Sequence, residues 1–525
     1  MRKNSIILLA IFANFFALAQ NNPPVVVIKS ASVDVVNQKV ELNYSLTDAQ
    51  NHSSMVWLKY SKDGGVFYDT ILSNNLTGDA GAGITNGSDK KIIWNYSGTS
   101  GNIYNTKLKL YASDGQTVSI ADIVKQVDSN NLRRTLRSMQ GVRNLGSSSI
   151  LIGKVRDSIE TLFKKYGFYT EKQTFSYNSL TGINITGRKP GMKAEDRTIV
   201  IDAHYDGVAG SPAADDNGSG VVGMMEAARI LRQYNFEHSL RFIGFDFEEA
   251  GLIGSQRYVQ SYIKSYEKLD GILNLEMIGF YSNKKNSQTV PTGFNLLFPQ
   301  AYQQLVNDTF KGNFIVVCGN TNSASLNTAY TKSTNLYVPQ LKMLSVEVPS
   351  NGQIAPDFRR SDHASFWDNN NKALMLTDGS NFRNANYHKA SDSIGTLNFN
   401  FMTNVVKATL ATAAALCKPI SAGYAEIDLA TVSGTHKHAH SLPVQLEIYP
   451  NPSDGKMVIE CNALEKFSSR AEVFDLTGKI VWQKVIDFNK GKETMALDLT
   501  GLPSGNYLIL FSSGDRTLTK SIIIE

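Results

Sequence analysis

The sequence predicts a multidomain protein in which a central α/β domain is flanked by an N-terminal and a C-terminal β-sandwich domain. The chain has 525 residues, which is too long for one hydrophobic core. Its first and last segments carry short runs of alternating apolar and polar residues, separated by turn residues. Its middle segment instead alternates continuous apolar runs with amphipathic helical stretches. That pattern predicts a mixed sheet with helices on both faces.

The first 19 residues have the pattern of a secretory signal peptide. Arg2 and Lys3 precede the apolar run 6–16, and Ala17-Leu18-Ala19 is a small-residue cleavage site. The apolar run is shorter than the roughly 20 residues that a transmembrane helix needs. We therefore expect an exported protein without a transmembrane anchor.

Residues 21–117 read as an all-β domain of immunoglobulin or fibronectin type, because alternating runs are separated by Asp-Gly, Asn-Gly and Gly-rich turns. Trp57 and Trp94 are interpreted as core residues of this domain. Residues 418–443 are predicted to be a linker that includes the tract HKHAH (436–440), which we interpret as solvated.

Composition excludes some classes of protein. The chain has 52 Lys and Arg against 47 Asp and Glu, a net charge of +5, and no dense basic cluster. The charge of the chain therefore does not indicate binding to nucleic acid. Three cysteines, Cys318, Cys417 and Cys461, do not make a disulfide framework. A bridge between Cys318 and Cys417 stays open at this point.

Residues 120–417 are predicted to form the α/β domain. Residues 120–170 have helical periodicity, and buried strands such as RTIVIDAH and DGILNLE then alternate with helices such as GVVGMMEAARILRQY. The domain is expected to end with the apolar helix that reaches residue 417.

Candidate metal ligands follow the predicted strands of this domain, where open α/β sheets bind their ligands. Zinc takes imidazole nitrogen and carboxylate oxygen, and two zinc ions can share a bridging carboxylate. The candidates are His204 and Asp206 after strand 198–203, Asp215 and Asp216 in the Gly-rich turn SPAADDNGSG, Glu248 and Glu249 after strand 239–247, Glu276 after strand 271–275, and His363 in RRSDHASFW.

Each candidate alone has an ordinary structural explanation. Asp-Asn-Gly is common turn chemistry, acids stabilise the first turn of a helix, and His363 suits an apolar core. Glu276 is harder to explain, since a carboxylate after ILNL is costly to bury without a cation. The convergence of the whole set favours a metal site.

The motifs HYD, DDNGSG, FEEAGLIGS, NLEMIG and SDHASFW, in this order, resemble the co-catalytic di-zinc aminopeptidases of the bacterial leucyl aminopeptidase type. The resemblance covers about residues 120–417. It implies two Zn²⁺ per chain, with Asp216 bridging them. It places His204 and Glu276 on one ion, and Glu249 and His363 on the other.

The same resemblance implies catalytic roles for two further acids. Glu248 would be the general base, and Asp206 would orient His204. Many relatives have Asp where this chain has Glu276. Downstream, Lys389 and Ala390 replace the usual Thr-Pro after His388, so a role of His388 in substrate positioning stays open.

Residues 444–525 read as a small β domain and resemble the sorting domain of the type IX secretion system. The matching stretches are YPNPSDG, FDLTGK, LPSGNYLI and the terminal LTKSIIIE. The resemblance implies export through the periplasm by the type IX secretion machinery, a secreted or cell-surface location, and a Bacteroidetes-type bacterium.

Together these features predict a secreted zinc-dependent aminopeptidase that acts on peptide or protein substrates. A glutaminyl-cyclase-like enzyme with one zinc, a dipeptidase or carboxypeptidase on the same scaffold, and a non-enzymatic surface protein are the alternatives. Side-chain specificity, oligomeric state, the ligand of the N-terminal sandwich and the site of C-terminal processing do not follow from the sequence.

Overall fold

The computed structural model describes residues 21–525 except residues 36, 98–102, 145–149, 433–441, 476–477 and 514–515. The predicted signal peptide and the HKHAH tract lie outside the described residues. Within the described part of the chain, no helix combines the length and the apolar character that crossing a membrane would require.

A sheet of eight strands forms the centre of the α/β domain, and it is mixed, as predicted. Its four middle strands run parallel, while β10, β9 and β15 join by antiparallel pairs and β16 pairs parallel to β15. In spatial order the strands are β16 (Met343–Val348), β15 (Ile315–Asn320), β17 (Ala373–Thr377), β14 (Lys268–Glu276), β11 (Ala194–His204), β13 (His238–Phe245), β10 (Leu180–Lys189) and β9 (Tyr169–Tyr177).

Helices cover both faces of this sheet, because successive strand residues point to opposite sides. In β11, Ile199 and Ile201 belong to one hydrophobic core and Val200 to the other. The first core is closed by α1 (Ile120–Lys125), α2 (Ser129–Met139), α3 (Ile150–Lys165), α4 (Gly220–Leu231), α8 (Ala324–Tyr337) and α10 (Phe399–Cys417). The second is closed by α5 (Ile253–Ser261), α6 (Phe294–Leu297), α7 (Pro299–Asn307) and α9 (His363–Asp368).

The central sheet separates Cys318 from Cys417. Cys318 lies in the second core and Cys417 in the first, on opposite faces of the sheet. All three cysteines are buried and free. Burial raises the pKa of the Cys318 and Cys417 thiols. The open question of a Cys318–Cys417 bridge is therefore answered: the structure has none between these two described residues.

The N-terminal β domain is a sandwich of two sheets around one core. One sheet has the order β1 (Val25–Asp34), β2 (Lys39–Thr47), β7 (Gly87–Asn95) and β5 (Leu76–Gly78). The other has the order β12 (Asn235–Phe236), β18 (Pro419–Asp428), β8 (Lys107–Thr117), β3 (Ser54–Ser61) and β4 (Asp69–Thr70), with β6 (Gly81–Ile84) also paired to β3.

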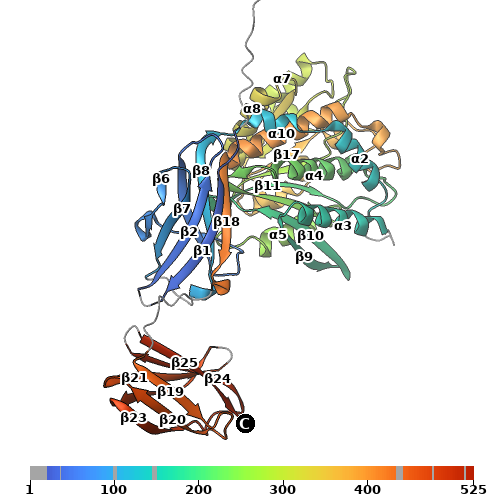
Figure 1. Cartoon of the computed structure of the whole chain (residues 1–525). Coiled ribbons are helices and arrows are strands. Elements are labelled where there is room, and N and C mark those ends of the chain that lie inside the picture. Colours follow the sequence, from blue (N-terminus) through green and yellow to red (C-terminus); the bar gives the residue numbers. More distant parts are fainter. Residues whose placement is uncertain are drawn as a thin grey trace, which may run out of the picture.

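Residues 419–428 correct the predicted linker. They form β18, which pairs with β8 in the N-terminal sandwich, and Figure 1 shows this orange strand beside the blue β8 and β1. The prediction failed because β8 leaves a sheet edge that only a strand distant in sequence fills, a pairing that local composition does not reveal. The chain thus leaves the sandwich after β8 and returns to it after α10.

The two predicted core tryptophans have different positions. Trp94 is buried in the sandwich core. Trp57 is only partly buried, stacks on Tyr111 and donates a hydrogen bond from Nε1 to the Met192 carbonyl oxygen. It therefore packs where the sandwich meets the α/β domain, and its assignment to the sandwich core was wrong.

The C-terminal residues form two antiparallel sheets around a separate core that includes Ile459, Val473 and Ile509. One sheet has the order β19 (Val444–Tyr449), β20 (Lys456–Ala463) and β23 (Gly491–Asp498). The other has the order β22 (Ile480–Phe488), β21 (Phe467–Phe474), β24 (Gly505–Ser513) and β25 (Arg516–Ile524).

Candidate metal centre

The candidate ligands meet at the carboxyl ends of the parallel strands. β11 ends at His204 and β14 ends at Glu276, while Glu248 and Glu249 follow the end of β13. Because these three strands are neighbours, their ends lie at one edge of the sheet. All four side chains are largely withdrawn from solvent.

The segment 214–219, which leads into α4, is tied to the end of β14. Asn217 donates from Nδ2 to the Leu275 carbonyl oxygen at 2.8 Å and accepts at Oδ1 from the Met277 amide at 3.0 Å. Ser219 Oγ accepts from the Ile278 amide at 2.9 Å. These bonds place Asp216 next to Glu276.

Asp216 is shared by two groups of ligands. Its Oδ1 lies 3.6 Å from His204 Nε2, which in turn lies 3.3 Å from Glu276 Oε2. Its Oδ2 lies 3.1 Å from His388 Nε2, which lies 3.3 Å from Glu249 Oε2. Each group offers one imidazole nitrogen and two carboxylate oxygens within 4.8 Å of one another.

His363 does not join these groups, which corrects its expected place. Its ring is buried, its Nε2 lies 2.8 Å from the Phe358 carbonyl oxygen, and it meets Trp367 edge-on. Burial lowers the pKa of His363 to about 3. From the same segment, Ser361 Oγ instead donates to Glu276 Oε2 at 2.8 Å. In the segment SDHASFW, Ser361 therefore contacts the site, whereas His363 packs in the core.

His388 takes the position expected of His363. The sequence signal was present in NYHKASDS, where an Asp follows His388 by four residues. Asp392 accepts hydrogen bonds from the Asp215 amide at 3.0 Å and the Asp216 amide at 3.2 Å. The segment thus supplies both a histidine and the support of the Asp216 loop, a link that only the folded chain makes visible.

Asp206 contacts several members of the site. Its Oδ1 lies 3.3 Å from His204 Nδ1 and accepts from the Glu248 amide at 3.2 Å. Its Oδ2 accepts from the Glu249 amide at 3.1 Å. One buried carboxylate therefore positions the His204 ring and the backbone of both glutamates.

Arg143 is a further residue that the sequence did not single out. It is buried and donates to the carbonyl oxygens of Tyr205, Met139 and Ala213 at 2.8–2.9 Å. Burial lowers its pKa to about 10, and the nearby Asp206 and Asp216 oppose that change. Its positive charge interacts with the acidic cluster at longer range, since no direct ion pair joins them among the described residues.

The electrostatics of the cluster fit bound cations. Burial, reinforced by Asp216, raises the pKa of Glu249 to about 7, and burial raises the pKa of Glu248 well above its usual value. His204 Nε2 and Glu249 Oε1 are buried and make no hydrogen bond. Crowded carboxylates and unpartnered ligand atoms are costly without a metal, and the His and carboxylate donors are those that zinc takes.

Glu248 stays outside both ligand groups. Its Oε2 lies 3.8 Å from His204 Nε2, and its side chain is 10% exposed. It thus has a free carboxylate beside the cluster.

An apolar pocket opens next to Glu276 and encloses about 60 Å³. Arg360 lines it too and donates hydrogen bonds to Asn381 Oδ1 and to the Tyr387 hydroxyl. Tyr387 stacks on His388 with ring centroids 3.7 Å apart. The apolar lining includes Val290, Phe294, Leu305, Phe358, Met375 and Phe382.

Comparison with known proteins matches two parts of the chain. Residues 184–413 match the model of peptidase family M28, and residues 447–525 match the model of the secretion system C-terminal sorting domain. Uncharacterized protein YfbL of Escherichia coli (strain K12) is 30% identical over 224 residues, which are 41% of this chain and 65% of that protein.

Aminopeptidase YwaD of Bacillus subtilis (strain 168) is 37% identical over 119 residues, which are 22% of this chain and 26% of that protein. The chain thus spans less than two thirds of the length of these curated relatives. The solved structure of BSAP, a zinc aminopeptidase from Bacillus subtilis, aligns with a TM-score of 0.44 and 15% identity, covering 56% of this chain and 96% of that chain.

Proposed function

We propose that the chain is an exported zinc-dependent aminopeptidase, because residues 184–413 match the model of peptidase family M28 and residues 447–525 match the model of the secretion system C-terminal sorting domain. The observation that carries the proposal is Asp216, whose two oxygens face two separate groups of ligands. A carboxylate in that position suits a bridge between two metal ions.

We propose that His204 and Glu276 hold one zinc ion, that His388 and Glu249 hold the other, and that Asp216 bridges them. When bound, the ions would supply Lewis-acid chemistry, which polarises a peptide carbonyl and favours deprotonation of water. Asp206 holds His204 through Nδ1 and so leaves Nε2 for the metal. This assignment replaces His363 by His388.

Glu248 is the proposed general base. Its carboxylate lies beside the ligand cluster and belongs to neither group, so it is available to take a proton from the attacking water. The same carboxyl then gives that proton to the leaving amine. Burial raises the pKa of Glu248 above its usual value, which favours the protonated form that must later give its proton to the leaving amine.

The apolar pocket beside Glu276 is the proposed site for the substrate's side chain. Its volume of about 60 Å³ is larger than the roughly 10–15 Å³ that a cavity needs to hold one water, and much of its lining is apolar, so the pocket suits a small aliphatic side chain. We therefore expect N-terminal residues with apolar side chains to be preferred over charged ones.

The second ligand group favours this function over the single-zinc glutaminyl cyclase. Asp216, Glu249 and His388 converge as closely as the first group does. The sorting domain supports export by the type IX secretion machinery to the cell surface or the medium.

The function is tested with a peptide that has a free N-terminus and an apolar first residue, together with its N-acetylated twin. Both peptides are incubated with the protein and zinc, and mass spectrometry identifies the products. We expect residues to be lost one by one from the N-terminus of the free peptide only. In the Glu248→Gln variant, turnover should fall by roughly 100-fold or more while zinc content is unchanged. Cleavage of both peptides, or cyclisation of an N-terminal Gln peptide instead, would contradict the aminopeptidase assignment.

A further inference from the structure

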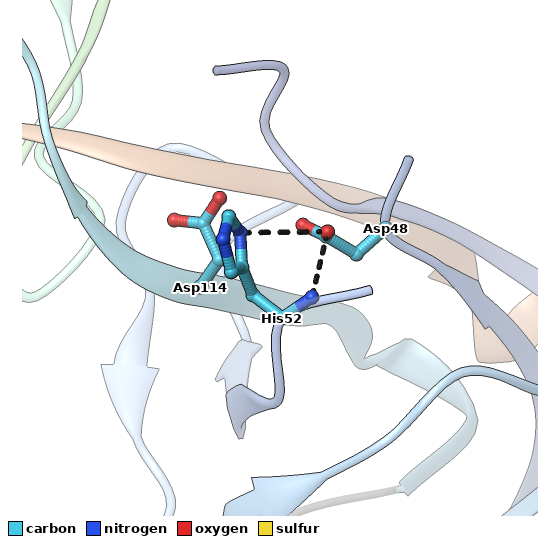
Figure 2. Close-up of side chains that lie close together, drawn as sticks. All are labelled: Asp48, His52 and Asp114. Carbon is cyan, nitrogen blue, oxygen red and sulfur yellow. Dashed lines mark hydrogen bonds and ion pairs between the residues drawn. The ribbon is translucent and has the colours of Figure 1, made fainter. Parts of the chain in front are cut away.

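A second cluster of potential metal ligands lies in the N-terminal sandwich, far in sequence from the proposed peptidase centre. Asp48 follows β2, His52 precedes β3, and Asp114 lies in β8. Figure 2 shows their side chains converging from these segments. One ligand atom of each residue lies within 4.8 Å of the other two. His52 Nδ1 lies 3.6 Å from Asp48 Oδ1.

The loop 48–52 is folded around the Asp48 carboxylate. Oδ1 accepts from the Gln50 amide at 2.9 Å and from the His52 amide at 3.0 Å. Asn86 holds the same loop by accepting from the Asp48 amide at 2.7 Å. Asp48 is 1% exposed, and its Oδ2 is buried without a hydrogen-bond partner. The loop therefore presents a carboxylate oxygen that nothing in the described chain satisfies.

Asp114 reaches the cluster from a β-bulge. Ser113 of β8 pairs with Ala422 of β18, and Thr117 pairs with Ile420. Residues 114–116 of β8 therefore lie opposite a single residue of β18, Ser421. Gly115 in this bulge has a φ of +70°, which favours glycine. The bulge turns an additional acidic side chain towards the β2–β3 loop.

The Asp114 carboxylate also accepts hydrogen bonds from side chains of two other segments. Its Oδ2 accepts from Asn21 Nδ2 at 2.8 Å and from Ser421 Oγ at 2.9 Å. Asn21 keeps a buried Oδ1 that makes no hydrogen bond. The cluster thus has a second unsatisfied oxygen close to Asp114.

The charges of this cluster are unbalanced. Asp48 and Asp114 are 1% and 8% exposed, and within the part of the chain that the structure describes neither pairs with a Lys or Arg. Two buried carboxylates beside one imidazole need a cation, because ionised groups are rarely buried unpaired.

We propose that Asp48, His52 and Asp114 bind one divalent transition-metal ion, for which zinc is the first candidate. The imidazole favours zinc over calcium, which takes oxygen ligands. Such an ion would join the β2–β3 loop to β8 and, through Ser421, to β18, the strand by which the chain returns from the α/β domain. The role is structural, since the cluster contains no further acid placed as Glu248 is.

Anomalous diffraction at the zinc edge tests the site on crystals of the whole chain. A peak between Asp48, His52 and Asp114 is expected, in addition to density at the proposed peptidase centre. The position of the peak separates this site from zinc bound elsewhere, including at the His-rich tract 436–440. If the peptidase centre shows peaks at saturating zinc and this cluster shows none, the proposal is overturned. Calcium bound there without His52 would overturn it equally.

Variants provide a second, independent measurement. His52→Gln and Asp114→Asn should each lower bound zinc by about one ion per chain and abolish part of the zinc-dependent rise in Tm, while peptide turnover stays unchanged. Asp89→Asn is the matched control, because Asp89 is an exposed acid of the same sandwich that pairs with Lys29. An unchanged zinc content in both cluster variants would show that His52 serves only as an ion-pair partner of Asp48.

Discussion

At the residue scale, the proposed centre depends on which histidine completes the second ligand group. The sequence favoured His363 as a metal ligand and left open a role of His388 in substrate positioning. His388 Nε2 lies 3.1 Å from Asp216 Oδ2, whereas His363 Nε2 is engaged by the Phe358 carbonyl oxygen. The two residues therefore form a natural pair for a test.

We expect His388→Ala to lower bound zinc by about one ion per chain and to reduce kcat/KM by roughly 100-fold or more, because a metal ligand contributes several kcal/mol. His363→Gln should keep both zinc content and kcat/KM near those of the unaltered chain. Elemental analysis and peptide hydrolysis measure the two effects. The reverse result would restore His363 as the ligand.

We expect His363 instead to make the free energy of unfolding depend on pH. Burial lowers its pKa from 6.5 to about 3, so in the folded chain it stays neutral where the unfolded chain binds a proton. The contribution of His363 to the free energy of unfolding is therefore fully present above about pH 6.5. It is lost as the pH falls towards 3.

Between about pH 6.5 and pH 5 the expected loss is roughly 1–2 kcal/mol, because the slope rises towards 1.36 kcal/mol per pH unit only below the unfolded pKa. The His363→Gln variant should lack this loss, so its free energy of unfolding falls less steeply with acidification. Urea titrations of the metal-free proteins between pH 5 and pH 7 measure the difference. Parallel curves would refute the linkage.

At the element scale, the segment 214–219 matters because it is held from two sides. Asn217 and Ser219 bind it to the residues at the end of β14, and Asp392 accepts from its amides. The position of Asp216 is therefore set by contacts with distant parts of the chain as well as by its own turn.

Asp392→Asn tests this support without touching a ligand. In Asn an NH₂ group replaces one carboxylate oxygen, so a donor faces backbone amides that themselves donate, and the negative charge that attracts those amides is lost. We expect zinc affinity to fall by roughly 10–100-fold, as for other groups that orient ligands. Lys389→Ala is the control, because Lys389 belongs to the same segment and is exposed. Zinc titration with a competing chelator measures the change, and equal affinities would argue against the role of Asp392.

At the scale of the whole molecule, β18 joins the N-terminal sandwich to the α/β domain. It follows α10 directly and pairs with β8 over residues 420–428. Its short partner β12 belongs to the segment between α4 and β13, so one sheet contains strands from both regions. We expect the sandwich and the α/β domain to depend on each other for stability.

Two truncations separate β18 from the C-terminal domain. A chain that ends at residue 432 keeps β18 and should retain both its fold and its peptide hydrolysis. A chain that ends at residue 417 leaves an edge of β8 open, and its Tm should fall by roughly 5 °C or more. Thermal melts by circular dichroism compare them. Equal Tm values would mean that β18 adds little to the sandwich.

The sequence by itself determined the classes of element and most of the residues of the proposed ligand set. Strand and helix periodicity are local properties, so the α/β domain and its β neighbours could be predicted from residues a few positions apart. His204, Asp216, Glu249 and Glu276 were found because each lies where a strand ends or a helix begins. The joining of β18 to β8 and the exchange of His363 for His388 were decided only by the tertiary structure. Both depend on contacts between residues far apart in the chain, which local patterns do not record. An apolar run follows His363 in the sequence and polar residues follow His388, but only packing shows that the first is buried in the core and that the second faces Asp216.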